Sequence, residues 1–454
     1  MEHRIYKGEF WLVQSPDHKL VGELEVINDN KILLNLEDVI DTSVTRTEYI
    51  NEPIKMEHEL IIGNLFNNEC VALIKSHFYR ISRQDNILLS YIFDIVLFTK
   101  ELRLDSLEDL EFDNIMFSFP NLHKYIGTCV TNLDIDDNHV SLTYQTIKDS
   151  LDLEDNIKLN LTYGYSLSLP WMETTQIRPT TMISLDLKNK FHVQDLLTLI
   201  DTRIGVLFSF VIGIYMCPIE IKLIFKHKKK KYLFNCFYRY FIKDEEEIAP
   251  KKYLFLRNIM SDLKLLLVKF YIFQNKYSLI TDNYIVLYKY KSIIEYEFLT
   301  ATYSLETFSR YVWDEHFFYD DDSFKTKYKK QMDFIASEFT DKENTDFIMK
   351  LQNNAKYSNE ISFRAIVKKI LKKYEDIFIG IFEYDQNTLS NEITNNRNWY
   401  THYSPELEKC AIHGIELYQL FVKVRVLFEV CLFKHLEMKD DMIINTIKTT
   451  YMIN

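Results

Sequence analysis

The sequence predicts an α+β protein, with an antiparallel β-rich domain at the N-terminus and an all-α helical bundle at the C-terminus. Short β-friendly runs separated by turn residues continue to about residue 190. Apolar residues spaced three and four positions apart then dominate. Because the 454 residues exceed the size at which one hydrophobic core stops growing, we expect two domains. They are residues 1–290, β-rich at first and then mostly helical, and residues 291–454, a helical bundle.

The β-rich region opens with runs at 8–13, 20–27 and 31–36. The turn-forming residues 28–30 (Asn-Asp-Asn) separate the last two runs, so we expect a hairpin there. Further apolar runs follow at irregular intervals, and this spacing predicts an antiparallel sandwich or barrel. These further apolar runs are 60–62, 71–74, 87–98, 115–119 and 140–144.

From about Val193 the period changes. Positions such as Leu196 and Ile200 follow the spacing that one buried helix face requires. Alternating aromatic residues within 226–241 interrupt this pattern and predict a strand pair. The acidic run 244–250 predicts an exposed loop.

Beyond residue 291 the pattern predicts only helices. The last of them is the best marked, because Ser404 can cap it, Pro405 suits the first helical position and Glu406 favours its positive end. The expected ranges are 293–316, 324–339, 345–354, 363–378, 388–399 and 405–436.

The net charge of −12 gives no general electrostatic footprint for nucleic acid. Any RNA site must therefore be a local basic patch. Most lysine runs are solvated faces, so each candidate run is a weak indication alone. The candidates are Lys226 with residues 228–231, the lysines within 325–330, and the pairs 368–369 and 372–373.

The cysteines lack any paired short spacing, so we expect reduced, mostly buried thiols, no metal site and no cofactor. The N-terminus does not have the pattern of an export signal, which predicts a cytoplasmic protein. The charge-free run 204–219 is shorter than the ~20 residues of a membrane span, so we interpret it as a buried core helix. We therefore expect no membrane association.

Arg397, Asn398 and His402 lie within six positions, directly before the last expected helix. Cleavage of RNA by its own 2′-hydroxyl needs a base, an acid for the leaving 5′-oxygen, and positive charge on the phosphorane. His402 can take and give protons near neutral pH. Arg397 can hold two phosphate oxygens and stabilise the developing charge. Asn398 can orient either group, so these three are the candidate catalytic residues.

Five steps along a continuous helix turn the chain by about 140°, which would direct Arg397 and His402 to different sides. We therefore expect the helix to end between them, with residues 401–404 bending His402 back toward Arg397. Pro405 favours an extended Ser404 within this bend. One histidine cannot be acid and base in the same step, so we predict an isologous homodimer that brings two motifs into one cleft.

A second arginine and histidine, Arg310 and His316, lie inside an expected continuous aromatic helix with no break to bring them together. We expect this pair to be structural, as core packing and a surface charge. His413, His435 and Cys410 share the last helix without the spacing of a metal site, and we expect them to be structural too.

The run 393–436 (ITNNRNWYTHYSPELEKCAIHGIELYQLFVKVRVLFEVCLFKHL) resembles the HEPN domain of ApeA-like proteins. In that family an Arg-Asn pair, a nearby histidine, a Pro-containing bend and a long apolar helix follow in this order. Gly8-Glu-Phe-Trp-Leu12, Pro16 and Val21-Gly-Glu-Leu24 are similar to the opening strands of the ApeA N-terminal domain. The resemblance is thin over residues 41–190.

The resemblance implies a metal-independent endoribonuclease of bacterial anti-phage defence, acting by abortive infection. It implies RNA as the substrate, with transfer RNA as the expected class. We expect the predicted homodimer to form through the HEPN domain, and the N-terminal domain either to sense an unidentified phage-derived trigger or to restrain the nuclease. The resemblance assigns Arg397 and His402 as catalytic and Asn398 as an accessory residue, with Tyr403 a weaker candidate for substrate contact.

Two other interpretations stay open. The helical domain could be a non-catalytic dimerisation or nucleotide-binding module, in which Arg397 is an ion-pair partner and His402 a satisfied core residue. It could also belong to a toxin–antitoxin pair in which Arg397 and His402 bind a nucleotide. Tyr400 or Tyr403 would then be acceptors of a nucleotidyl group.

Overall fold

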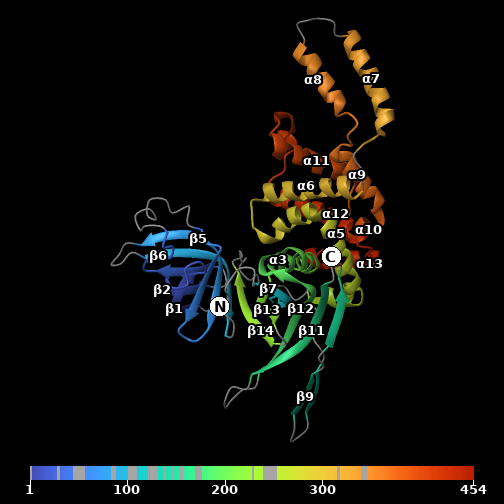
Figure 1. Ribbon diagram of the computed structural model, residues 1–454. Coiled ribbons are helices and arrows are strands. Elements are labelled where there is room, and N and C mark those ends of the chain that lie inside the picture. The colour runs from blue at the N-terminus through green and yellow to red at the C-terminus, as the bar shows by residue number, and fades with distance from the viewer. Residues whose placement is uncertain are drawn as a thin grey trace. The chain divides into compact units, whose positions relative to one another are not determined.

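The chain forms two compact units, residues 1–272 (unit 1) and 273–454 (unit 2), which are described separately below. Their secondary structure is drawn in Figure 1. The expected boundary at 290/291 falls just after the helix α5 (Tyr253–Lys289), whereas the compact units divide within it. The computed structural model describes residues 3–27, 31–43, 57–82, 88–100, 110–120, 122, 131–135, 140–144, 147–153, 157–168, 176–227, 230–238, 253–313, 317–338 and 345–453.

Unit 1 begins with a closed antiparallel barrel of strands β1–β6. Hydrogen-bonded neighbours follow the order β6-β3-β2-β1-β4-β5, and β5 pairs with β6 to close the ring. The barrel was one of the two forms expected, and the hairpin of β2 and β3 is confirmed, although its turn lies outside the described residues. The strands are β1 (Arg4–Leu12), β2 (Leu20–Ile27), β3 (Lys31–Leu36), β4 (Leu60–Leu65), β5 (Cys70–Ser82) and β6 (Leu88–Thr99).

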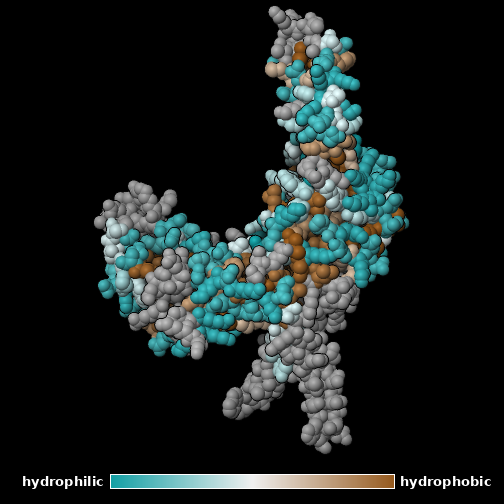
Figure 2. Space-filling model, turned by 45° about the vertical axis from the view of Figure 1, so that its right-hand side comes forward, coloured by the Kyte–Doolittle hydropathy of each residue, from teal (hydrophilic) through white to brown (hydrophobic). Residues whose placement is uncertain are grey.

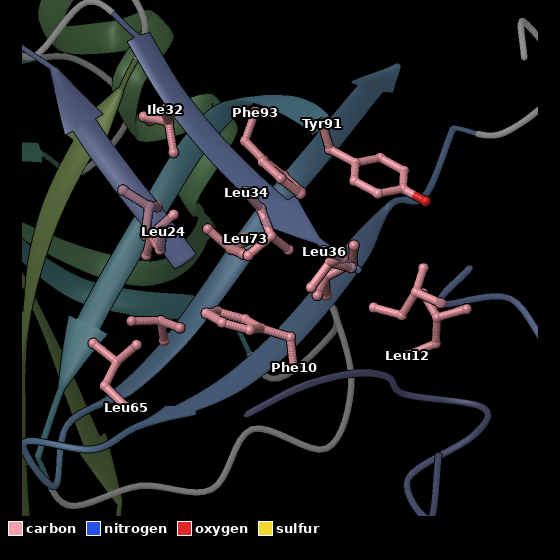
Figure 3. Packing of buried hydrophobic residues seen from close by; sticks show 14 of the residues in the cluster. Phe10, Leu12, Leu24, Ile32, Leu34, Leu36, Leu65, Leu73, Tyr91 and Phe93 are labelled. Carbon is pink, nitrogen blue, oxygen red and sulfur yellow. The ribbon is translucent and has the colours of Figure 1, made fainter. Parts of the chain in front are cut away.

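Alternating apolar side chains fill the barrel. Phe10, Leu24, Leu34, Leu73 and Phe93 are each 0 % exposed and belong to one buried cluster. Figure 3 shows these side chains pointing toward one another from different strands. The alternation of apolar and polar residues therefore determines which face of each strand lies inside the barrel.

Gly8 lets β1 approach β4 closely. It stands opposite Gly22 of β2 and Leu65 of β4. A Cβ atom at Gly8 would lie 2.5 Å from the carbonyl oxygen of Asn64, which is backbone and cannot rotate away. Glycine is required here by a close approach of strands.

The sheet continues beyond the barrel through β6. Residues 89–93 of β6 pair with β3, and residues 95–98 pair with β14. From β14 the order is β13-β7-β12-β11-β10, all antiparallel, and β13 with β14 is the expected strand pair. The bounds are β7 (Glu111–Ser118), β10 (Ile147–Asp152), β11 (Ile157–Ser168), β12 (Gln176–His192), β13 (Ile219–His227), β14 (Lys230–Tyr238), and the separate hairpin β8 (Thr131–Ile135) with β9 (Val140–Tyr144).

The helical extension of unit 1 begins at Val193, as the period change predicts. It consists of α3 (Val193–Thr198), a π-helical segment η2 (Leu199–Gly205) and α4 (Val206–Ile212). The expectation that 204–219 is one buried helix is wrong in its second half, because Gly213 adopts a left-handed conformation (φ 80°) and ends α4. Among the described residues, no helix is both long and apolar enough to cross a membrane.

Unit 2 is helical, as expected. α5 is kinked at Tyr277, whose backbone leaves the helical region, and its second half packs in unit 2. One expected helix, 363–378, is divided in two at Tyr374, which has φ −123°. The helices are α6 (Ile294–Val312), α7 (Asp321–Glu338), α8 (Thr345–Lys356), α9 (Phe363–Lys373), α10 (Glu375–Ile381), α11 (Gln386–His402), η5 (Pro405–Cys410), α12 (Gly414–His435) and α13 (Asp440–Tyr451).

α7 and α8 form a hairpin that packs mainly on itself. Figure 1 shows the pair extending away from the other helices of unit 2, and Figure 2 shows that its surface is largely hydrophilic. The base of the hairpin is closed by a bridge between Phe317 and Glu360. The side chain of Asn359 also bonds the backbone N–H and C=O of Tyr319, at 2.9 and 2.8 Å.

A buried polar cluster joins α5, α12 and α13. Tyr284, Tyr288 and Tyr451 all donate to the same carboxylate oxygen of Glu429, at 2.6, 3.0 and 2.6 Å. The guanidinium of Arg425 lies 3.5 Å from that oxygen and against the ring of Tyr288. Removing one partner of such a buried pair typically costs ~3–5 kcal/mol, so the cluster fixes how these three helices pack.

Candidate active site

The three candidate residues lie in the last turns of α11. Asp385 caps the start of this helix by accepting a hydrogen bond of 2.7 Å from the Thr388 N–H. The helix ends at Tyr403, which adopts the left-handed conformation (φ 49°, ψ 41°) that terminates many helices. Helical geometry thus extends through both Arg397 and His402.

Arg397 is held by two side chains. One terminal nitrogen (Nη2) lies 3.2 Å from Oε2 of Glu306 on α6, and the other (Nη1) donates to Oδ1 of Asn398 at 3.1 Å. The guanidinium also faces the ring of Phe363 on α9. Its side chain is 32 % exposed, so a fixed cation remains accessible from solvent.

Glu306 serves two arginines. Its other oxygen, Oε1, accepts from Arg310 Nη2 at 3.0 Å, and Arg310 also reaches the carbonyl oxygen of Ile361 at 3.3 Å. Arg310 is thus structural, as expected. However, α6 ends at Val312, so the expectation that one helix continues to residue 316 is wrong, and His316 lies outside the described residues.

His402 is exposed at the very end of α11. The expectation that the helix ends between Arg397 and His402 is wrong, because the backbone N–H of Tyr403 still bonds to Trp399 and Thr401 Oγ1 bonds to the Arg397 carbonyl. Helical spacing therefore separates the two side chains by about 140° around the axis. Within the described residues of this single chain, no hydrogen bond or ion pair joins Arg397 to His402.

The bend follows His402 instead of preceding it. Ser404 is extended (φ −67°, ψ 121°), as expected before a proline, but its side chain makes no capping bond. The single helix expected over 405–436 is wrong at its start. Pro405–Cys410 is a 3₁₀ turn, and α12 begins only at Gly414, which itself has a left-handed φ of 55°. Glycine accepts this conformation without strain.

The bend brings His413 to Tyr400. The Tyr400 hydroxyl lies 2.6 Å from the Ile412 carbonyl oxygen and 2.8 Å from His413 Nδ1. Burial, followed by the nearby Glu295 carboxylate, raises the pKa of Tyr400. The expectation that His413 lies within the last helix is wrong, because α12 begins at Gly414, and no spacing in the sequence signals the contact of His413 with Tyr400.

The structure bears on the alternatives and on the lysine runs. His402 is exposed, which does not fit a satisfied core histidine.

The lysines at 325, 327, 329 and 330 are exposed on α7, whereas Lys373 lies 3.8 Å above the ring of Trp313. In the described part of the chain, no group of three or more histidine, cysteine or acidic side chains is arranged to hold a metal ion.

Comparison with known families finds two matches. The family model for ApeA N-terminal domain 1 matches residues 5–270, more than half of the chain, and the model for Apea-like HEPN matches residues 299–442. No curated protein and no solved structure matches the chain. The second match includes all three candidate residues.

Proposed function

Because this chain belongs to the ApeA-like family, with an ApeA N-terminal domain followed by an Apea-like HEPN domain, we propose that it is an endoribonuclease whose catalytic residues are Arg397 and His402. The HEPN domain itself supports a role in RNA cleavage or in nucleotide binding. The observation that carries the finer proposal is a fixed, accessible guanidinium and an exposed histidine in the last turns of one helix.

The reaction follows from these groups. A histidine removes the proton of a ribose 2′-hydroxyl, the oxygen attacks the adjacent phosphorus, and a second histidine protonates the departing 5′-oxygen. The products are a 2′,3′-cyclic phosphate and a 5′-hydroxyl end. Arg397, oriented by Asn398 and Glu306, neutralises the charge on the phosphorane. The chemistry requires no metal ion.

We propose that a homodimer completes the site, because one chain offers one His402 and directs it away from Arg397. Exposed apolar side chains lie at the end of α11 and in the first turns of α12, and they support an interface there. Tyr403 is 65 % exposed, Ile415 is 70 % exposed, and Tyr418, almost one turn further along α12, is 48 % exposed. Exposed apolar clusters of this kind are typical of interaction surfaces.

The biological setting is proposed by family membership. The enzyme would act in the bacterial cytoplasm, cleave transfer RNA and stop the growth of a phage-infected cell. Unit 1 would receive the phage-derived trigger, which would raise a basal rate of RNA cleavage, since the catalytic residues all lie in unit 2.

Cleavage by the purified protein tests this proposal. Wild-type protein in a chelator should cut single-stranded RNA and transfer RNA and leave 2′,3′-cyclic phosphate ends. Arg397→Ala and His402→Ala should each reduce the rate by roughly 100-fold or more. The matched controls are Arg4→Ala and His77→Ala, at residues of unit 1, which should cut like wild type. Unchanged cutting by either site variant would remove the assignment.

The Arg397–Glu306 ion pair also favours one rival, a purely structural arginine in a non-catalytic module. That rival predicts a different result. Arg397→Ala would lower the thermal midpoint, His402→Ala would change nothing, and the wild-type protein would not cut RNA. Thermal unfolding of both variants beside the cleavage assay separates the two functions.

A further inference from the structure

A pocket of about 350 Å³ opens beside the end of α11. Its walls come from the start of α6, the last turn of α11 and the residue before α12. Aromatic rings make up much of the lining, together with one carboxylate. The lining residues are Ile293, Glu295, Tyr296, Leu299, Trp399, Tyr400, Tyr403 and His413.

The pocket is suited to a flat aromatic ligand. The rings of Trp399 and Tyr403 meet edge to face, with centroids 5.4 Å apart, and Tyr296 is 63 % exposed. Single-stranded RNA is recognised mainly by stacking unpaired bases on such rings and by hydrogen bonds to base edges. The volume falls at the small end of the range for ligand pockets, which suits one base with part of its ribose.

One wall of the pocket is held rigid. The Ile412 carbonyl can only accept, so the single hydrogen of the Tyr400 hydroxyl is used there. His413 Nδ1 must then be the donor in its bond to the Tyr400 oxygen, which fixes both the tautomer and the orientation of the imidazole. A preorganised wall favours selection of one ligand shape.

Glu295 supplies chemical selectivity. It is partly buried, lines the pocket, and lies close enough to Tyr400 to raise the pKa of that phenol. A carboxylate has two acceptor oxygens and no donor. The Watson–Crick edge of guanine offers an N1–H and an N2 amino group side by side, which match two acceptors. Adenine and cytosine each offer one amino group beside an acceptor nitrogen, which the carboxylate repels.

We propose that this pocket binds a guanine base of the RNA substrate, with Glu295 accepting from its Watson–Crick edge. The inference rests on the proposed nuclease function and adds a base preference to it. Trp399 and Tyr403 flank His402 in the chain, so a base in the pocket is anchored within one helical turn of the proposed general acid or base. The enzyme therefore cuts RNA next to guanine.

A cleavage assay tests the preference. Oligonucleotides with one guanosine in an otherwise uniform sequence are compared with the same chains carrying inosine, which lacks the N2 amino group, or adenosine. Wild-type protein should cut the guanosine chain roughly 10- to 100-fold faster, the discrimination that a bidentate contact provides. Glu295→Gln should abolish this ratio while still cutting. Glu416→Gln, an exposed glutamate outside the pocket lining, is the matched control and should keep it.

A binding assay separates this inference from the nuclease proposal. Guanosine 5′-monophosphate should quench Trp399 fluorescence in wild-type protein but not in Glu295→Gln, with adenosine 5′-monophosphate inactive and Trp399→Phe assigning the signal. Selective binding without any RNA cleavage would remove the nuclease proposal and the RNA origin of the base, leaving a site for the free nucleotide. Cleavage with equal rates for all three oligonucleotides, in both wild type and Glu295→Gln, would overturn the guanine pocket.

Discussion

Arg397 is oriented from a distant part of the sequence. Its partner Glu306 stands 91 positions earlier, on α6, and itself is shared with Arg310. A cation at a reaction centre contributes most when it is already aimed at the phosphate before substrate binds. In the proposed mechanism, Glu306 is therefore a positioning residue.

Glu306→Gln should lower kcat for RNA cleavage by roughly 10- to 100-fold, because the amide can no longer hold both guanidinium groups. The KM should change little, since the charge of Arg397 remains. Steady-state kinetics on a defined oligonucleotide give the two parameters. Glu392→Gln, an exposed glutamate on α11, is the control and should match wild type. A variant with normal kcat would show that the ion pair has no part in catalysis.

Only some residues of the candidate site could be predicted from the sequence. Arg397, Asn398 and His402 were identifiable because reaction chemistry requires their types close together, but the position of the bend was predicted wrongly, since α11 continues through His402. Whether they are catalytic stays a prediction. Glu306, Glu295 and His413 could not be found in this way, since each reaches the motif only through helix packing or through the bend at residues 403–413.

Elements were predicted better than their ends. Periodicity located the helices of unit 2, because a buried face repeats over several turns. The ends depend on single residues. Tyr403 and Gly414 take left-handed conformations, and Pro405 begins a 3₁₀ turn, so one expected helix became a turn, a linker and α12. The residue type at position 403, tyrosine, does not by itself indicate that α11 ends there.

The tyrosines that bind Glu429 make the packing of α5, α12 and α13 sensitive to alkaline pH. Burial, with the Glu429 carboxylate next for Tyr284 and Tyr288, raises the pKa of Tyr284, Tyr288 and Tyr451 in the folded state. Because the folded-state pKa of each tyrosine is raised, the protonated tyrosines stabilise the fold fully below about pH 10, the pKa of tyrosine in the unfolded chain. This contribution is lost as the pH rises further.

The free energy of unfolding should therefore fall above about pH 10, by up to ~1.4 kcal/mol per pH unit for each tyrosine. Denaturant unfolding followed across this range measures it. Tyr451→Phe should reduce the slope by about one proton. Tyr303→Phe, at a residue 54 % exposed on α6, should leave the slope unchanged. Equal slopes in wild type and Tyr451→Phe would show that this cluster does not control alkaline stability.

At the scale of the whole molecule, barrel closure could not be read from the sequence. Alternation predicts that each strand has an inner face, but not which strand pairs with which. β5 pairs with β6, and β6 pairs with β3 along one part and with β14 along another. These pairings depend on contacts between strands and are not encoded in the pattern of any one strand. The α+β class is confirmed. It could be predicted because it depends only on the order along the chain of the strand-like and helix-like spacings of apolar residues.

Mixed dimers provide a test of the composite site. Wild-type and His402→Ala chains, mixed in equal amounts, unfolded together and refolded, should cleave RNA at about a quarter of the rate of the same total amount of refolded wild type. Only dimers of two wild-type chains keep both histidines, and they make up about a quarter of the dimers in such a mixture. The same two proteins refolded separately and then mixed are the control, which should keep about half of the rate. A co-refolded mixture that also keeps half of the rate, with mixed dimers shown by a tag on one chain, would mean that each chain works alone.

The hairpin of α7 and α8 has a consequence for how this family can vary. Phe317 and Glu360 bridge its two ends, and Asn359 ties them to the backbone of Tyr319. The polypeptide thus leaves and re-enters the bundle at nearly one point. We therefore expect changes in the length of α7 and α8 to leave the register of α6 against α9 unchanged, and a fluorescent or affinity module inserted within the hairpin to leave the helical bundle folded.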